Sequence, residues 1–296
     1  MIDYDEFGLF HENAEEFGLA YDGPPVVRRE SVAVDGTRRL SALVWGEASP
    51  DLVLLHGGGQ NAHTWDTVAL ALDRPLVAID LPGHGHSDGP RDDGGSYAAA
   101  EDVAAAIRAL APDAPMIVGM SFGGLTSLAL SRVAPELIRR LALVDVTPGV
   151  NPEKAKAIAD FLNGPESFPD FDEILARTIE FNPTRSVSSL RRGILHNAEQ
   201  RPDGTWVWRH QRYRSKGLPE RPVPEELWDA VSDLAVPLML VRGMRPSSVV
   251  DDADETELLR RCPSARVEHV PDAGHSVQGD TPLELAALLT DFLETT

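Results

Sequence analysis

Five apolar runs, separated by helix-like segments, place the strongest constraint on the fold of this chain. They are DLVLLHG (51–57), PLVAID (75–80), PMIVGM (115–120), RRLALVDV (139–146) and PLMLVRG (237–243). A strand that is apolar along its whole length is buried on both faces, which is typical of a parallel sheet covered by helices. Regular alternation of such strands with helices indicates right-handed crossover connections. The sequence therefore predicts an α/β fold.

Three segments flank or interrupt this alternation. Residues 1–25 form an N-terminal extension, and residues 26–46 contain two β-rich segments around a DG turn, which predict an antiparallel hairpin. Residues 147–234 contain several helical patterns and a proline-punctuated aromatic stretch, but no buried parallel strand. We therefore predict a core built from residues 26–146 and 235–296, with the intervening segment as a helical cap over the carboxyl edge of the sheet.

The charge balance narrows the classes of partner. The chain has 27 basic and 47 acidic residues, which gives a net charge of −20. Phosphate backbones and anionic membrane surfaces repel a protein of this charge. We therefore expect a small-molecule substrate, with neither nucleic acid nor a membrane as partner. A homodimer is compatible with this composition.

Cysteine content and hydropathy bear on the cellular compartment and on the possible crosslinks and metal clusters. Cys262 is the only cysteine, so an intrachain disulfide and a thiolate metal cluster are excluded. The N-terminal segment has neither a basic region nor a continuous apolar stretch of the kind found in secretory signals, and no apolar run is long enough to span a membrane. These features predict a cytoplasmic location.

The stretch GMSFGG places a serine between two glycines where an apolar strand ends and a helix begins. Residues Gly119 to Gly123 fit the pattern G-x-S-x-G, with Ser121 at its centre. The pattern marks a nucleophile when it lies in a sharp strand-to-helix turn, because the glycines relieve crowding and the serine oxygen then protrudes. The alternative is a purely structural glycine turn. The strand before it and the helix after it favour the nucleophile.

A glycine-rich loop, LLHGGGQNAHTW (54–65), follows an earlier central strand. Consecutive glycines let a backbone approach a substrate closely. We predict that the N–H groups of Gly58 and Phe122 form an oxyanion hole, with His56 and Trp65 ordering the loop. The alternative, a phosphate-binding loop, lacks both the G-K-[ST] ending and the G-x-G-x-x-G spacing.

These motifs together resemble those of the α/β-hydrolase superfamily. The segments HGGGQNAHTW, AIDLPGHGHSDGP, GMSFGG, LVDVTP and PDAGHS occur in the family's order and spacing, over roughly residues 30–146 and 236–296. The resemblance implies a mostly parallel eight-stranded sheet with helices on both faces and a serine nucleophile after the fifth strand. It also implies a histidine after the eighth strand and a cap between the sixth and seventh strands.

His275 is the predicted general base. It lies in PDAGHS, on a loop that follows the last strand and so faces the same sheet edge as Ser121. A histidine with a pKa near neutrality suits proton abstraction from a serine. Another motif, GHGHSD, partly resembles a dinuclear metal site but lacks its further histidine, so we expect no metal and no cofactor. His84 and His86 of this motif lie in a turn after the run PLVAID, and we interpret His196 and His210 in the cap as structural or surface residues.

The orienting acid is the least determined member of the triad. The family most often places it just after the seventh strand, but there this chain has Ser247 and Ser248. Asp145, at the end of the sixth strand, is the favoured candidate, because some relatives draw the acid from that position. Asp251 and Asp252 remain as alternatives, although an aspartate at the start of a helix is sufficiently explained by capping.

The predicted function is that of a serine hydrolase with a Ser121–His275–Asp145 triad and an acyl-enzyme intermediate. The expected substrate is a small or medium apolar ester, lactone or thioester, or a compound cleaved at a C–C bond next to a carbonyl. The alternatives are an acyltransferase, a cofactor-free oxidative enzyme, or a non-catalytic receptor for a small molecule. Aromatic cap residues either line an apolar pocket or form the cap's own core: Phe161, Phe168, Phe171, Trp206 and Trp208.

Overall fold

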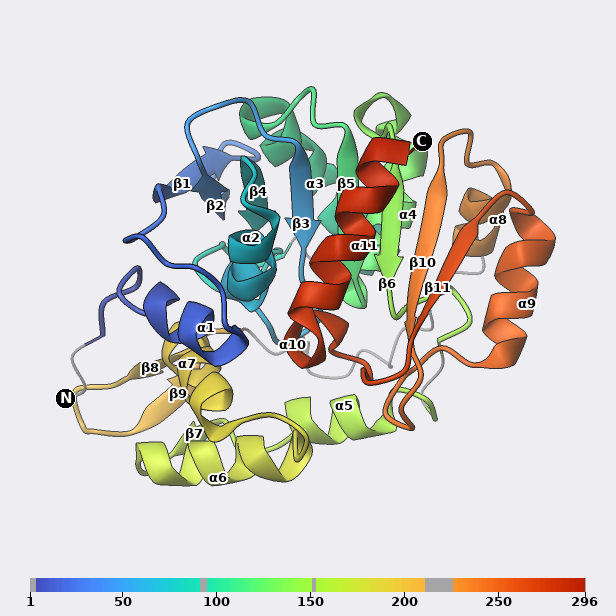
Figure 1. The fold of residues 1–296 in the computed structure, drawn as a ribbon. Coiled ribbons are helices and arrows are strands. Elements are labelled where there is room, and N and C mark those ends of the chain that lie inside the picture. Colours follow the sequence, from blue (N-terminus) through green and yellow to red (C-terminus); the bar gives the residue numbers. More distant parts are fainter. Residues whose placement is uncertain (1–3, 91–94, 151–152, 211–225, 296) are drawn as a thin grey trace.

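A single eight-stranded sheet organises the protein. The computed structural model describes residues 4–90, 95–150, 153–210 and 226–295. The strands of the sheet are β1 (Val27–Ala33), β2 (Arg39–Trp45), β3 (Leu52–Leu55), β4 (Leu76–Ile79), β5 (Met116–Met120), β6 (Leu141–Val144), β10 (Leu238–Gly243) and β11 (Arg266–Val270). Their order is β1-β2-β4-β3-β5-β6-β10-β11 (Figure 1).

Strand directions follow the expectation from the apolar runs. β1 and β2 pair antiparallel, as the hairpin prediction required, and β2 is also antiparallel to β4. From β4 to β11 every neighbouring pair is parallel. The mostly parallel eight-stranded sheet is therefore confirmed.

Helices cover both faces of the sheet (Figure 1). One face carries α2 (Asp66–Leu72) and α11 (Pro282–Thr295), and the other carries α3 (Gly95–Leu110), α4 (Phe122–Val133), α8 (Glu226–Ser232) and α9 (Asp252–Arg261). Strand β3 shows why two cores form: Leu52 and Leu54 point into one, and Val53 and Leu55 into the other. Burial of such side chains stabilises the fold by about 1.5–3 kcal/mol each. None of the helices in the described ranges is long and apolar enough to cross a membrane.

The segment 153–210 of the insertion between β6 and β10 lies at the carboxyl ends of the parallel strands (Figure 1). It contains the helices α5 (Lys156–Leu162), α6 (Phe171–Phe181) and α7 (Val187–Asn197). It also contains a small antiparallel sheet in the order β7-β9-β8, made of β7 (Ser167–Phe168), β8 (Ala198–Gln200) and β9 (Trp206–Trp208). Residues 211–225 of the predicted cap lie outside the described residues.

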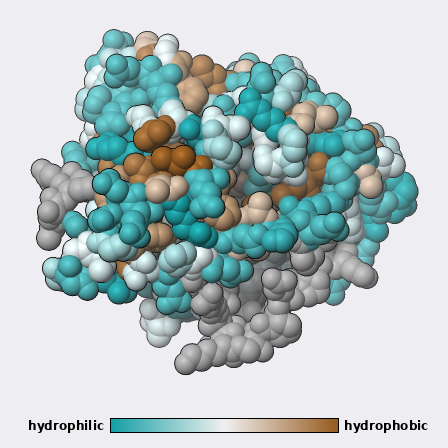
Figure 2. Space-filling model, turned by 90° about the horizontal axis from the view of Figure 1, so that it is seen from below, coloured by the Kyte–Doolittle hydropathy of each residue, from teal (hydrophilic) through white to brown (hydrophobic). Residues whose placement is uncertain are grey.

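Two observations refine the predicted cap. Phe168 and Trp206 are buried in a separate apolar cluster with residues of α6 and α7, so these aromatic residues belong to the cap's own core. Helix α8, by contrast, buries Leu227 and Val231 among residues of the main core. Residues 147–234 thus include one helix that packs on the sheet's helical layer. Seen from the cap side, the surface is mostly hydrophilic, with apolar residues gathered in a few patches (Figure 2).

The N-terminal extension packs on both core and cap. Its helix α1 (Phe10–Phe17) buries Phe10 against Trp45 of β2, with ring centroids 5.0 Å apart. Glu16 forms an ion pair with Arg192 of α7. Glu6 accepts a hydrogen bond from Nε of Arg29 at 2.8 Å, which ties the extension to β1. The remaining short helices are η1 (Ala62–Trp65), η2 (Pro135–Leu137) and α10 (Val277–Asp280).

Glu6→Gln is expected to lower the free energy of unfolding by about 2–3 kcal/mol at pH 7. Burial alone would raise the pKa of Glu6, but hydrogen bonds from His63 and Arg29 lower it from 4.5 to about 2. Because the folded-state pKa is depressed, the stabilisation is present above about pH 4.5 and is lost as the pH falls through about 2.

Urea unfolding of the wild type and of Glu6→Gln at pH 7 and pH 3 measures this contribution. The difference between the two proteins should shrink to less than half at pH 3. An equal difference at both pH values would show that the carboxylate charge contributes nothing.

Candidate active site

Ser121 lies in a strained turn between β5 and α4. Its φ is 52° and its ψ is −120°, a backbone conformation that L-residues rarely adopt. The flanking glycines are required by packing. A Cβ on Gly119 would lie 2.5 Å from the carbonyl oxygen of Gly123, and a Cβ on Gly123 would lie 2.3 Å from the carbonyl oxygen of Leu55. The turn therefore presses against the neighbouring strand and exposes the serine at the sheet's carboxyl edge.

Gly123→Ala is expected to destabilise the protein by about 3 kcal/mol or more, because overpacking against backbone costs ~1–3 kcal/mol and here the neighbouring strand must move. Gly193→Ala is the matched control. Gly193 lies within α7, and a Cβ there would meet no atom within 4 Å. Alanine should stabilise that helix by about 0.5–1 kcal/mol. Chemical denaturation of both variants checks the pair, and equal stability of the two would contradict the packing argument.

Asp145 and His275 come together from two different strand ends. Asp145 follows β6, and His275 follows β11. The Nδ1 atom of His275 lies 2.9 Å from Oδ2 of Asp145. Ser121 and His275 line one cavity. The structure thus brings together the three residues that the sequence selected.

The carboxylate of Asp145 is fully buried and held by several donors. Its Oδ1 accepts hydrogen bonds from the N–H of Gly243 at 3.0 Å and from the hydroxyl of Ser248 at 2.6 Å. Its Oδ2 accepts from the N–H of Val249 at 3.1 Å as well as from His275. Hydrogen bonds to a charged acceptor are stronger than neutral ones and compensate its burial. The backbone at Asp145 also has a positive φ of 46°, which aims the side chain at the strand β10.

The alternative acids lie elsewhere. Asp251 accepts a hydrogen bond from the N–H of Asp254 at 2.9 Å as the N-cap of α9, and it forms an ion pair with Lys154. Asp252 has a side chain that is 95% exposed and pairs with Arg242. Both carboxylates therefore have structural partners outside the cavity.

Ser248 is the site residue whose role the sequence did not reveal. It occupies the position where the family most often has the acid, and its hydroxyl instead donates to Asp145. The absence of a carboxylate after the seventh strand was the available signal. It indicated an acid from another strand, but it did not indicate that the serine would support it.

The glycine-rich loop is ordered by two buried histidines. Nε2 of His56 accepts a hydrogen bond from the N–H of Leu81 at 2.9 Å, and Nε2 of His84 accepts from the N–H of Gly59 at 3.0 Å. Burial, together with the nearby His84, lowers the pKa of His56 to about 3, so its imidazole is neutral. His84 therefore supports the loop through this hydrogen bond. Asp80 completes the loop's support by accepting from the N–H of Ala62 at 2.7 Å.

Close packing brings this loop against the nucleophile. A Cβ on Gly57 would lie 2.5 Å from Sδ of Met120 and 3.1 Å from Cβ of Ser121. Gly58 lines the same cavity as Ser121. Phe122 is the first residue of α4, so its N–H lies at the positive end of the helix dipole. Both predicted oxyanion donors therefore belong to backbone segments that border the serine.

The cavity above Ser121 has a volume of about 240 Å³. Helix α5 of the cap supplies one wall through Ala157, Ile158, Phe161 and Leu162, and Leu162 packs over Gly59. The glycine-rich loop, Ser121 and His275 also line this cavity. Of the aromatic cap residues that the sequence singled out, Phe161 lines this cavity, next to Ile158 and Leu162.

Comparison with known proteins gives a consistent picture. Residues 52–288 match the sequence pattern of the alpha/beta hydrolase family. The chain is 43% identical over 301 residues to the esterase Rv0045c of Mycobacterium tuberculosis (strain ATCC 25618 / H37Rv), with 98% of this chain and 96% of that protein covered. A structure of that esterase, from work on its inhibition by transition metals, matches with a TM-score of 0.85 and 43% identity over 99% of this chain and 100% of that chain.

A second, more distant relative is a hydrolase of Mesorhizobium japonicum (strain LMG 29417 / CECT 9101 / MAFF 303099). It is a 2-(acetamidomethylene)succinate hydrolase, 26% identical over 250 residues, which cover 83% of this chain and 89% of that protein. A solved structure of E-2-(acetamidomethylene)succinate hydrolase has a TM-score of 0.80 and 25% identity, over 91% of this chain and 100% of that chain.

Proposed function

Since the chain belongs to the alpha/beta hydrolase family, we propose that it hydrolyses carboxylic esters through an acyl-enzyme formed on Ser121. The observation that carries this proposal is the hydrogen bond between His275 and the buried Asp145, on the wall of the cavity that contains Ser121. A carboxylate that orients an imidazole beside a serine is the arrangement that activates a hydroxyl nucleophile.

The proposed reaction proceeds in two steps. His275 accepts the proton of Ser121 as the serine oxygen attacks the ester carbonyl, and it then donates that proton to the departing alcohol. Water, deprotonated by the same imidazole, next attacks the acyl-enzyme. The bond between the acyl carbon and the serine oxygen then breaks, the imidazolium returns its proton to that oxygen, and the acid is released. Asp145 holds His275 in the tautomer with the proton on Nδ1 and stabilises the imidazolium that forms in each step.

The negative charge that develops on the carbonyl oxygen needs preorganised donors. We assign this role to the backbone N–H groups of Gly58 and Phe122, which border Ser121 from two sides. Donors fixed by the fold stabilise a transition state without the reorganisation that water would need, and loss of one such donor costs a factor of about 10²–10³ in kcat. His56 and His84 support this hole indirectly, because they hold the glycine-rich loop in place.

The cavity indicates the class of ester. Its cap wall is apolar, through Ile158, Phe161 and Leu162, and its volume is about 240 Å³. Ligand sites for drug-sized molecules are larger, with volumes of about 300–1,000 Å³. A short or medium aliphatic acyl group therefore fits better than a long chain. The net charge of −20 further opposes anionic polymers as substrates.

A fluorophosphonate probe tests the proposed function. Wild-type protein should be labelled covalently at Ser121, as shown by peptide mass spectrometry. A protein that stays unlabelled while folded would not be a serine hydrolase, and a binding role for the same cavity would then be the better interpretation.

p-Nitrophenyl esters of increasing acyl length test the proposed substrate class. We expect kcat/KM for the butyrate ester to exceed that for the palmitate ester by at least about tenfold, since each methylene without room in a pocket costs ~1–3 kcal/mol. Initial rates over the series measure this preference. A maximum at the palmitate ester would contradict the size limit inferred from the cavity.

A further inference from the structure

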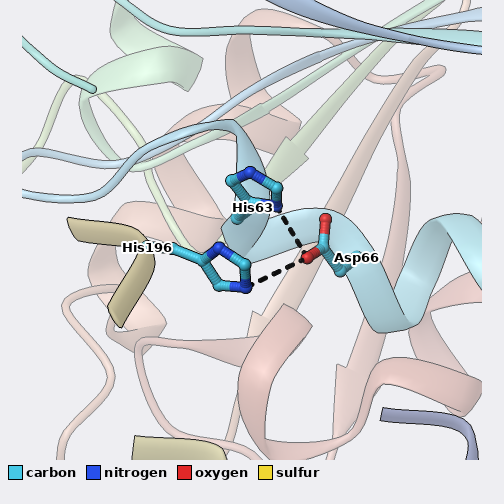
Figure 3. A group of neighbouring side chains, drawn as sticks. All are labelled: His63, Asp66 and His196. Atoms are coloured by element: carbon cyan, nitrogen blue, oxygen red, sulfur yellow. Dashed lines mark hydrogen bonds and ion pairs between the residues drawn. The ribbon is translucent and has the colours of Figure 1, made fainter. Parts of the chain in front are cut away.

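A second group of buried ionisable side chains lies where the cap meets the core. His63 belongs to η1, Asp66 begins α2, and His196 belongs to α7 of the cap. All three are buried, and their side chains point toward one another (Figure 3). Nδ1 of His63 lies 2.8 Å and Nε2 of His196 lies 3.7 Å from Oδ2 of Asp66.

Two ligand atoms of this group have no partner among the described residues. Oδ1 of Asp66 and Nε2 of His196 are buried and make no hydrogen bond there. A buried polar atom without a partner costs about 1–3 kcal/mol. Side chains whose unpartnered polar atoms lie close together are therefore suited to bind a ligand between them.

The outer nitrogen of each histidine is already occupied. Nε2 of His63 lies 3.1 Å from a carboxylate oxygen of Glu6, and Nδ1 of His196 lies 2.7 Å from the hydroxyl of Tyr4. Histidines that ligate metals usually donate their second N–H to a carboxylate or another acceptor, which fixes the ring and its tautomer. A cation bound beside Asp66 would displace the proton that Nδ1 of His63 shares with Oδ2 of Asp66, whereas Nε2 of His196 makes no hydrogen bond among the described residues.

Local charge also favours a cation. The carboxylates of Glu6 and Asp66 both contact His63, and Arg29 pairs with Glu6 and with Asp80 nearby. His63 lies between two carboxylates, so a hydrogen-bonded proton occupies the side of Nδ1 that faces Asp66. A divalent cation beside Asp66 would take the place of that proton and pair with the same carboxylate.

From these observations we propose that His63, Asp66 and His196 form a binding site for a divalent transition-metal ion such as Zn²⁺. Two imidazole nitrogens and a carboxylate suit Zn²⁺, Cu²⁺ and Ni²⁺, whereas Mg²⁺ and Ca²⁺ prefer oxygen ligands. The three residues line a cavity of about 170 Å³, which has ample room for a water molecule as a fourth ligand.

Binding requires a small movement of the rings. The two imidazoles stack with centroids 3.8 Å apart and planes 12° apart. Lone pairs in parallel rings do not converge, so the rings must tilt apart around the ion. The ligand atoms already lie within 4.8 Å of one another, so the backbone can stay in place.

The position of the site gives the ion a structural effect. It would join α7 of the cap to the core at residue 63, near the end of the glycine-rich loop, and at residue 66, the first residue of α2. The cavity beside the site shares Gly59, Gln60, Phe161 and Ser276 with the cavity above Ser121. A bound ion would therefore hold the cap against the core next to the proposed active site.

Equilibrium dialysis of chelator-treated protein against ZnCl₂, followed by metal analysis, tests the proposal. Wild type should bind one ion per chain at this site. His196→Gln and Asp66→Asn should each weaken binding by at least ~100-fold, because loss of an outer-shell partner alone costs ~10–100-fold. His11→Gln, which changes an exposed histidine of α1, is the matched control and should bind as wild type does.

His275→Gln separates this site from the proposed catalytic centre. If the ion binds at the cluster, this variant should keep wild-type affinity. Loss of binding in His275→Gln with retention in His196→Gln would overturn the proposal, as would a wild type that binds no ion. Since the readout is binding, either result is independent of ester hydrolysis.

Tyr4→Phe and X-ray absorption cover the case in which the ligand variants fail to fold. Tyr4→Phe removes the hydroxyl next to Nδ1 of His196 and should weaken binding by ~10–100-fold. The zinc absorption spectrum of wild type should show two imidazoles and oxygen ligands. Unchanged affinity in Tyr4→Phe, or a spectrum with fewer than two imidazoles, would contradict the assignment.

Discussion

Ser121→Ala is expected to lower kcat for ester hydrolysis by a factor on the order of 10⁶ while leaving the fold intact. Alanine removes the hydroxyl that, in the proposed mechanism, forms the acyl-enzyme, so that only transition-state binding by the proposed oxyanion donors would remain. The methyl group fits the space of the serine side chain. Both residues tolerate the positive φ of this turn equally poorly, so stability should hardly change.

Rates on a p-nitrophenyl ester, fluorophosphonate labelling and thermal unfolding together measure this effect. Ser131→Ala is the matched control, because Ser131 lies further along α4 and its hydroxyl donates to the carbonyl of Leu128. This control should hydrolyse esters at the wild-type rate. If Ser121→Ala kept more than about a hundredth of the wild-type kcat, water or another residue would be the nucleophile.

Asp145→Asn is expected to lower kcat by up to about 10⁴-fold. An asparagine amide can accept hydrogen bonds on only one side, so its NH₂ group must face either His275 or the donors Gly243 and Ser248. In either case His275 loses the carboxylate that fixes its tautomer and stabilises its charge. Asparagine adopts positive φ readily, so the backbone at this position should not be strained.

Asp251→Asn and Asp252→Asn are the controls for this prediction. Asparagine caps helices about as well as aspartate, so α9 should stay intact, and neither carboxylate contacts His275 in the described part of the chain. Steady-state kinetics of all three variants distinguish the candidates. If Asp145→Asn kept near wild-type turnover and Asp251→Asn or Asp252→Asn lost most of it, the acid that orients His275 would lie at the start of α9.

Local sequence patterns were sufficient to predict the architecture of the sheet. The apolar runs predicted the parallel strands, because burial on both faces leaves no polar alternation. The G-x-S-x-G turn predicted the elbow, and the packing explains why: a Cβ on Gly123 would collide with the carbonyl of Leu55. The loop that carries His275 was likewise predictable, since it follows the last strand and parallel strands end at one edge.

The partner of His275 was not predictable in the same way. Asp145 and Asp251 both lie near strand ends in the sequence, and the choice depends on the adjacency of β6 and β10 in the sheet. That adjacency brings Gly243, Ser248 and His275 around one carboxylate. Such contacts join residues that are far apart along the chain, and the local spacing of apolar and polar residues does not predict them.

The same limit applies to the cap interface. Nothing in the local pattern pairs His63 with His196, because one belongs to the loop after β3 and the other to a cap helix. Docking of the N-terminal extension, which places Tyr4 and Glu6 beside these rings, is equally non-local. By itself, the sequence determined the sheet, the turn at Ser121 and the position of His275 at the same sheet edge, because these follow from burial and steric limits within short segments. Only the tertiary structure placed Asp145 against His275 and brought His63, Asp66 and His196 together, because each contact depends on which distant segments pack side by side.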